Sequence, residues 1–149
     1  MIGFIGAALK VGHSAIVLAT EPHREIVLQR LRKEVDVDAA IRQGTYVSLD
    51  AAENPDPVRF SEIVKGSLEA ARKVAKAEHP RVAFCGEGAG RLWAEGKLDD
   101  AIRLEQFCDE LAGTYDIDIL CAYPISLHDQ ECEHALQRIC EGHSTVYSY

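Results

Sequence analysis

Apolar residues recur along this chain with two different spacings, which predict strands and helices in turn. Four short runs are mostly apolar, as in strands covered on both faces: residues 14–20, 45–50, 81–85 and 117–123. Elsewhere apolar residues return every three or four positions, which predicts helices over residues 2–9, 21–33, 37–43, 60–77, 89–95, 99–113 and 127–142. The final HSTVYSY is read as a further extended segment.

Strands that alternate with helices in this way predict an α/β fold. We expect three layers, with a mainly parallel sheet of four or five strands flanked by helices. A length of 149 residues suits one domain over residues 1–149. Thr20 is placed to cap the helix over 21–33, and Asp99 or Asp100 to cap the helix over 99–113.

Composition narrows the classes of partner. The net charge is −8, and the basic residues are interleaved with acidic ones, so we expect no direct nucleic-acid contact. No apolar run approaches the length of a membrane span, so we expect no membrane partner. Five cysteines without a CxxC pair favour reduced thiols and a cytoplasmic location.

Polar side chains stand at the carboxyl end of each predicted strand. They are Thr20, Asp50, Glu87 and Tyr123, and His23 follows the first of them within a turn of helix. Because ligands of open parallel sheets bind beyond these ends, the pattern predicts a small-molecule site. An imidazole titrates near neutrality, so His23 would add pH sensitivity to it. The alternative is that these groups only cap helices and close turns.

The turn after the third strand is rich in glycine but has the wrong spacing for a nucleotide. Gly86, Gly88 and Gly90 form G-x-G-x-G, whereas the dinucleotide fingerprint is G-x-G-x-x-G. No G-x-x-x-x-G-K-S/T loop occurs, and Glu87 within the turn would repel phosphate. The turn is therefore read as a close helix–strand packing contact, with nucleotide binding disfavoured.

Glu105 lies on the apolar stripe of its predicted helix. A carboxylate in that position needs a partner or a shifted pKa, and Arg91 or Arg103 is the expected partner. A structural ion pair is favoured over catalysis. Trp93 is expected in the core or in a pocket wall.

The sequence gives weaker support for a metal-binding site or a catalytic nucleophile. His128 and Cys132 are four residues apart on one helix face, and Cys140 could share that face. His134 and His143 are near in sequence, but no second compact pair completes a tetrahedral set. No G-x-S-x-G elbow is present. The sequence therefore predicts no metal site, no cofactor and no catalytic residues.

Several separated motifs resemble the MEDS domain, the sensory domain named after the dichloromethane-responsive regulator DcmR. They are, in order, AIVLATEPHREIVLQRL, GTYVSLDAAE, Gly86-Glu87, LWAEG at 92–96, Leu104-Glu105, LCAYP at 120–124 and EGHSTVYSY. The resemblance covers nearly the whole chain. It implies a RecA/KaiC-like fold that lacks the phosphate loop, and a module that senses small organic or hydrocarbon-derived ligands.

Two departures from the family pattern qualify this expectation. Members usually begin with a further strand carrying an H-x-x-x-x-Y-like motif, which this sequence lacks. We expect either a shortened form or another segment, such as one from a partner subunit, in place of that strand. An uncovered strand edge would favour pairing with a second copy as a homodimer. Gly88 stands where the family more often has a bulky apolar residue, which predicts a more open pocket near Glu87.

Together these observations predict a non-catalytic sensory or regulatory module. Its ligand would contact Thr20, His23, Asp50, Glu87 and Tyr123, with Trp93 and Glu105 in support, and its signalling partner would be a histidine kinase or a transcriptional regulator. One alternative is an interaction module without a ligand. The other is a degenerate nucleotide-hydrolysing enzyme that uses Asp50 and Glu87 with a metal.

Overall fold

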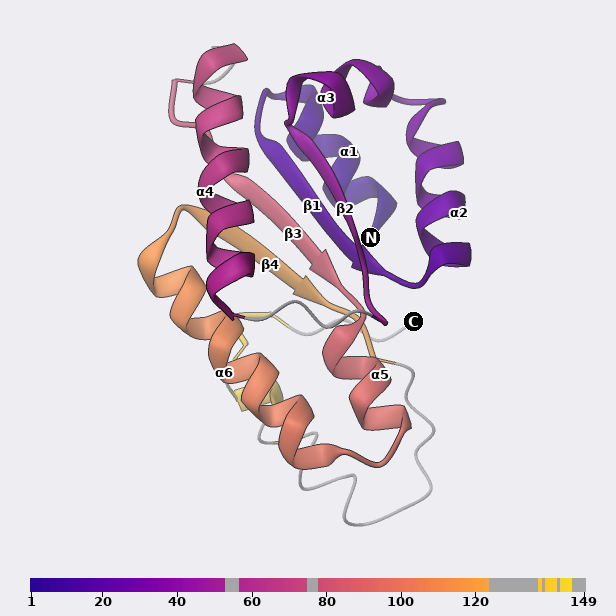
Figure 1. The fold of residues 1–149 in the computed structure, drawn as a ribbon, viewed down its shortest axis with the longest axis vertical. Coiled ribbons are helices and arrows are strands. Elements are labelled where there is room, and N and C mark those ends of the chain that lie inside the picture. Colours follow the sequence, from indigo (N-terminus) through magenta and orange to yellow (C-terminus); the bar gives the residue numbers. More distant parts are fainter. Residues whose placement is uncertain (53–56, 75–77, 124–136, 138, 142, 146–149) are drawn as a thin grey trace.

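A computed structural model describes residues 1–52, 57–74, 78–123, 137, 139–141 and 143–145 (Figure 1). Helices and strands alternate along it. The elements are α1 (Ile2–Lys10), β1 (Ser14–Ala19), α2 (Glu21–Leu31), α3 (Val37–Gln43), β2 (Tyr46–Asp50), α4 (Pro57–Val74), β3 (Val82–Gly86), α5 (Gly88–Ala94), α6 (Leu98–Thr114) and β4 (Ile117–Cys121).

The four described strands form one parallel sheet in the order β2-β1-β3-β4. β1 is a central strand, because Ile16 pairs with Val47 on one side and Phe84 on the other. Every residue of β1 is buried, which explains why its sequence is apolar throughout rather than alternating. β2 and β4 are the edges of the described sheet.

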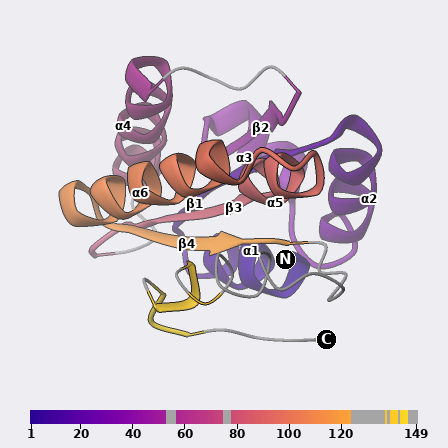
Figure 2. The same cartoon turned by 90° about the horizontal axis from the view of Figure 1, so that it is seen from below.

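The two faces of the sheet carry separate apolar cores. Ala15, Val17 and Ala19 of β1 face α1, α2 and α3, whereas Ile16 and Leu18 face α4 and α6. Figure 2 shows α4 and α6 on one side of the sheet and α1 on the other. The three-layer α/β fold with a parallel sheet, predicted from the sequence, is confirmed.

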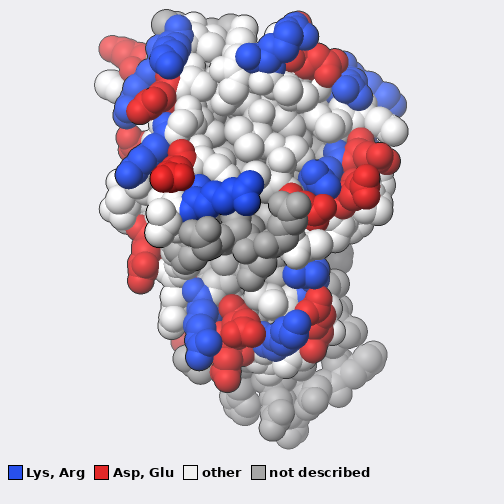
Figure 3. Space-filling model, in the orientation of Figure 1, with Lys and Arg blue, Asp and Glu red and all other residues white. Residues whose placement is uncertain are grey.

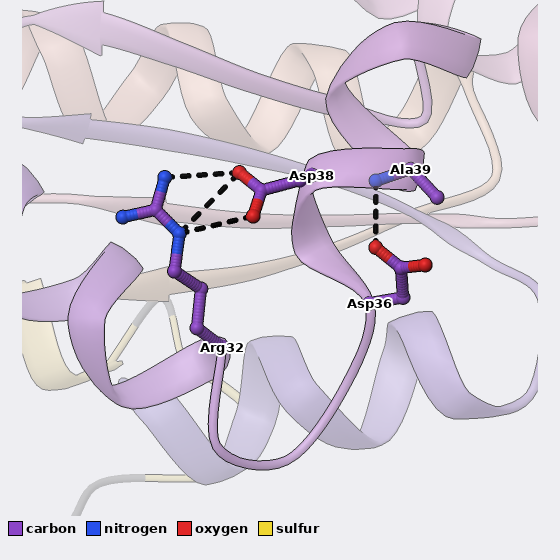
Figure 4. Close-up of polar contacts among 4 residues, drawn as sticks. All are labelled: Arg32, Asp36, Asp38 and Ala39. Atoms are coloured by element: carbon purple, nitrogen blue, oxygen red, sulfur yellow. Dashed lines mark hydrogen bonds and ion pairs between the residues drawn. The ribbon is translucent and has the colours of Figure 1, made fainter.

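Short-range hydrogen bonds hold the connection between α2 and α3 (Figure 4). The Asp36 carboxylate accepts from the backbone N–H of Ala39 at 2.9 Å and so caps α3. Arg32 donates two parallel hydrogen bonds to the Asp38 carboxylate. Gly44 ends α3 with a φ of 71°, in the left-handed region that glycine tolerates best.

Two predicted caps are wrong in detail. α6 begins one residue before Asp99 with Lys97 at its N-cap, so the two aspartates lie in the first turn rather than at the cap. Thr20 occupies the N-cap of α2, but its hydroxyl makes no capping hydrogen bond. Of the predicted last helix, 137 and 139–141 are helical and its other residues lie outside the described ones. Residues 143–145 form no strand, and 146–149 lie outside the described part.

Charged side chains are spread rather than gathered on the face seen in Figure 1. Figure 3 shows Lys and Arg interspersed with Asp and Glu around an uncharged central area. None of the described helices is both long and apolar enough to cross a membrane.

Candidate ligand-binding site

The sheet order creates a crevice at the carboxyl ends of β1 and β3. After β1 the chain turns into α2, which packs on one face of the sheet, and after β3 it turns into α5 and α6 toward the other. Chains that leave neighbouring parallel strands toward opposite faces open a crevice between them, where open α/β sheets bind ligands. Thr20 and Glu87 are the first residues beyond these two strands.

The Glu87 carboxylate occupies the α2 side of this crevice. It accepts a hydrogen bond from His23 Nδ1 at 2.7 Å and lies 3.4 Å from the backbone nitrogen of Thr20. The positive end of the α2 dipole stabilises a negative charge in this position. A phosphate that approached the start of α2 would have to displace Glu87.

Asp50, at the end of β2, is held by the same turn of α2. Its carboxylate lies 2.9 Å from Nη2 of Arg24 and also accepts from the backbone N–H of Ala52 at 2.8 Å. His23 and Arg24 are adjacent, so the first turn of α2 pairs with both carboxylates. The structure thus brings Thr20, His23, Asp50 and Glu87 together, and adds Arg24, which the sequence analysis did not single out.

A second polar group lies around Glu105 on α6. Glu105 is 6% exposed, so the predicted burial is confirmed. The predicted partners are wrong, because Arg91 pairs with Glu95 and Arg103 with Asp100. Arg103 is exposed and Arg91 is partly buried, and each is paired on its own helix or turn rather than with Glu105.

The partners of Glu105 lie at the end of β4 and later in the chain. Tyr123 donates its hydroxyl to Oε1, Cys121 donates its thiol to Oε2 at 3.3 Å, and Nε2 of His143 lies 3.5 Å from Oε2. Burial and the contact with Glu105 raise the pKa of the Tyr123 hydroxyl above its ordinary range. The contact with Cys108, burial and the Glu105 charge raise the pKa of the Cys121 thiol in the same direction. Both groups are therefore protonated donors.

Trp93 supports this second group. It is buried, and its ring meets the ring of Tyr123 edge to face, with centroids 5.9 Å apart and planes at 89°. The prediction that Trp93 lies in the core is confirmed. Tyr123 therefore belongs to the Glu105 group and not to the one around Glu87.

An apolar pocket lies between the two polar groups, at the ends of β1, β3 and β4. The enclosed cavity is small, about 20 Å³, and lies within a hollow of about 420 Å³ that includes its open mouth. No charged side chain is found among its described lining residues, which are Leu18, Phe60, Phe84, Gly86, Gly88, Ala89, Leu104, Phe107, Cys108 and Cys121.

Gly88 sets the size of this pocket. A Cβ atom at Gly88 would lie 3.1 Å from Cδ2 of Leu104 and 3.3 Å from Cδ2 of Leu18, both lining residues. Any side chain at this position would therefore enter the pocket. Gly88, which stands where the family more often has a bulky residue, is thus part of the pocket wall.

A comparison with protein families identifies the chain. The family model described as MEDS, the MEthanogen/methylotroph, DcmR Sensory domain, matches residues 1–143. The chain belongs to the MEDS family. None of the curated proteins and none of the solved structures matches it. Membership of this family gives the MEDS chain a sensory or regulatory role.

Sequence reasoning placed five candidate residues at or just beyond strand ends, Trp93 on α5 and Glu105 on α6, but missed two residues that contact Glu105. Cys121 was taken only as one of five reduced cysteines, and His143 was noted only as lying near the metal candidates His128 and Cys132 in the sequence. No local spacing links residues 105, 121 and 143. His128, Cys132 and His134, considered for a metal site, lie outside the described residues, and Cys140 does not join the Glu105 group.

Proposed function

We propose that this MEDS chain senses a small, uncharged, apolar molecule that binds in the pocket at the ends of β1, β3 and β4. The observation that carries the proposal is a pocket at the predicted crevice whose described lining is apolar, with no charged side chain. Binding in such pockets is favoured by removing apolar surface from water. Small halocarbons and hydrocarbons have this chemistry.

The size of the pocket limits the ligand. The enclosed space holds about one water-sized sphere, so a molecule with several heavy atoms enters only if lining side chains move. Phe60 packs edge to face against both Phe84 and Phe107, and all three rings line the pocket. Binding therefore requires this ring cluster to rearrange, which couples occupancy to the positions of α4 and α6.

The turn that carries Glu87 connects the pocket to the surface. Gly86 and Gly88 both line the pocket, and Glu87 between them donates its backbone N–H to the carbonyl of Leu18, another lining residue, at 2.9 Å. A ligand that shifts this turn also shifts the Glu87 carboxylate away from His23 and the start of α2. We propose that this movement of α2 is the output, received by a histidine kinase or a transcriptional regulator.

The seven residues predicted as ligand contacts surround this pocket and do not belong to its described lining. Direct ligand contact by Thr20, His23, Asp50, Glu87, Trp93, Glu105 or Tyr123 stays a prediction. In the proposal, ligand binding in the pocket changes the hydrogen bonds among these residues.

The test uses dichloromethane and benzene as small and larger apolar probes in thermal unfolding. A molecule held only by the native state raises the melting temperature as its concentration rises. We expect dichloromethane to raise it, and the Gly88→Ala variant, whose added methyl group occupies the pocket, to lose this shift. Gly66→Ala is the matched control, because a Cβ at Gly66 meets nothing within 4 Å.

Two outcomes would contradict the proposal. An equal shift in the wild type, Gly88→Ala and Gly66→Ala proteins would place the probe elsewhere. No shift with either probe would favour the interaction module without a ligand. Magnesium-dependent stabilisation by ATP, lost in Glu87→Gln, would instead support the nucleotide-hydrolysing alternative.

A further inference from the structure

The group around Glu105 contains three side chains of different chemistry in the arrangement of a metal site. Among the described residues, an oxygen of Glu105, the sulfur of Cys121 and a ring nitrogen of His143 all lie within 4.8 Å of one another. Carboxylate, thiolate and imidazole are the three ligand types that Zn²⁺ takes from proteins. From this convergence we propose that Glu105, Cys121 and His143 bind Zn²⁺, a function beyond that of the apolar pocket, whose lining includes Cys121.

The two distances from Glu105 fit a tetrahedral ion. Oε2 of Glu105 lies 3.3 Å from the sulfur of Cys121 and 3.5 Å from Nε2 of His143. A tetrahedral Zn²⁺ with bonds of about 2.3 Å to sulfur and about 2.0–2.1 Å to nitrogen and oxygen separates its ligand atoms by roughly 3.3–3.6 Å. The separations of Cys121 and His143 from Glu105 are therefore those of ligands that share one ion, and the sulfur and the ring nitrogen lie within 4.8 Å of each other.

The tautomer of His143 is suited to this role. Its Nδ1 lies 2.7 Å from the backbone carbonyl of Ile139, and because a carbonyl oxygen can only accept, Nδ1 carries a proton. In the neutral ring, Nε2 then has a lone pair directed at Glu105. A lone pair that faces a carboxylate oxygen is stabilised by a proton or a metal ion between the two atoms. A ring N–H donated to a backbone carbonyl is the usual support of a metal-binding histidine.

Glu105 is also held as metal-binding carboxylates usually are. Tyr123 donates to Oε1, which leaves Oε2 directed at Cys121 and His143. Trp93 packs against the Tyr123 ring and limits its movement. When Zn²⁺ binds, the Cys121 thiol releases its proton to solvent and the sulfur takes the metal. Three protein ligands leave a fourth position for water or a small ligand.

The competing interpretation is a hydrogen-bonded cluster, in which a second proton on His143 faces Glu105 and no metal binds. Cobalt distinguishes the two, because tetrahedral Co²⁺ with a thiolate ligand shows visible ligand-field bands and a sulfur-to-metal charge-transfer band. We would titrate the untagged, chelator-treated chain with Co²⁺ and then with Zn²⁺. The expected result is one Co²⁺ per chain with both bands, and their loss when Zn²⁺ displaces cobalt.

Variants assign the ligands. Cys121→Ser should abolish the charge-transfer band, and His143→Gln and Glu105→Gln should each weaken Co²⁺ binding by about 100-fold or more. Tyr123→Phe, which removes only the support of Glu105, should weaken it by about 10- to 100-fold. Cys140→Ser and His79→Gln are matched controls outside the cluster and should bind as the wild type does.

Far-UV circular dichroism checks that each variant is folded, and three single-ligand variants keep the test open if one does not fold. No stoichiometric Co²⁺ or Zn²⁺ binding by the folded wild-type chain would overturn the proposal. Binding that is unchanged in folded Cys121→Ser, His143→Gln or Glu105→Gln would do the same. The outcome of the dichloromethane experiment does not decide this test, because Co²⁺ binding is measured directly and Gly88 is not one of the proposed metal ligands.

Discussion

Gly90 is the position where a single methyl group should distort the candidate site. Gly90 lies in the middle of α5, where alanine is ordinarily more favourable than glycine by about 1 kcal/mol. A Cβ atom built on Gly90 would lie 2.1 Å from the carbonyl oxygen of Ala122 and 3.0 Å from Cα of Tyr123. The chain just after β4 therefore occupies the space that a side chain would need.

The magnitude follows from these contacts. An ordinary carbon–oxygen contact is about 3.3 Å or longer, so α5 and the chain after β4 must separate by roughly 1 Å in Gly90→Ala. Overpacking of this kind costs typically 1–3 kcal/mol, and the upper end applies because backbone cannot rotate away as a side chain can. With about 1 kcal/mol regained from helix propensity, Gly90→Ala should lose about 2 kcal/mol of stability.

Urea unfolding followed by the fluorescence of the single tryptophan, Trp93, measures this loss. For a chain of this length the melting temperature should fall by about 4–8 °C. Trp93 is three residues from Gly90 and packs on Tyr123, so its native-state fluorescence should change as well. Gly66→Ala, in open space on α4, should instead gain about 0.5–1 kcal/mol.

Opposite signs for the two glycine-to-alanine changes are the decisive result. If Gly90→Ala were as stable as the wild type, or more stable, the close approach of α5 to the end of β4 would be wrong. The assignment of Tyr123 to the Glu105 group would then lose its support.

Two further predictions concern the core and a helix cap. Burial raises the pKa of Cys85 to about 12 from its ordinary 9.0, so between these pH values the unfolded chain loses a proton that the folded chain keeps. The free energy of unfolding should therefore fall as the pH rises from 9 to 12, by up to about 1.4 kcal/mol per pH unit from this thiol. Urea unfolding at a series of pH values measures this slope, and the Cys85→Ala variant should show a flatter one. Asp36→Ala removes the cap of α3 and should cost about 1 kcal/mol at neutral pH, whereas Asp36→Asn should retain most of the stability. Equal losses for the two Asp36 variants would show that the cap is not the cause.

The order of elements and the fold class could be predicted from the sequence because both depend on local patterns. Neighbouring strands and helices cover β1 on both sides, so all its consecutive residues are buried and most of them are apolar. The helix over Val37–Gln43 was predicted with its observed bounds, since Gly44 stops it locally. The grouping of Thr20, His23, Asp50 and Glu87 also followed, because parallel strands end at one edge of a sheet.

The partners of each site residue were decided only by tertiary structure. The sequence determined that Glu105 would be buried, because its position on the helical stripe is a local property. Its partners, Cys121, Tyr123 and His143, are 16 to 38 residues away along the chain, and no short-range periodicity relates such positions. The nearby arginines were the natural choice from spacing, but Arg91 pairs with Glu95 and Arg103 with Asp100. The Glu105 carboxylate, the Cys121 thiol and the His143 imidazole come together only in the folded molecule. Their proximity depends on how the helices pack on the sheet, which no short stretch of sequence determines.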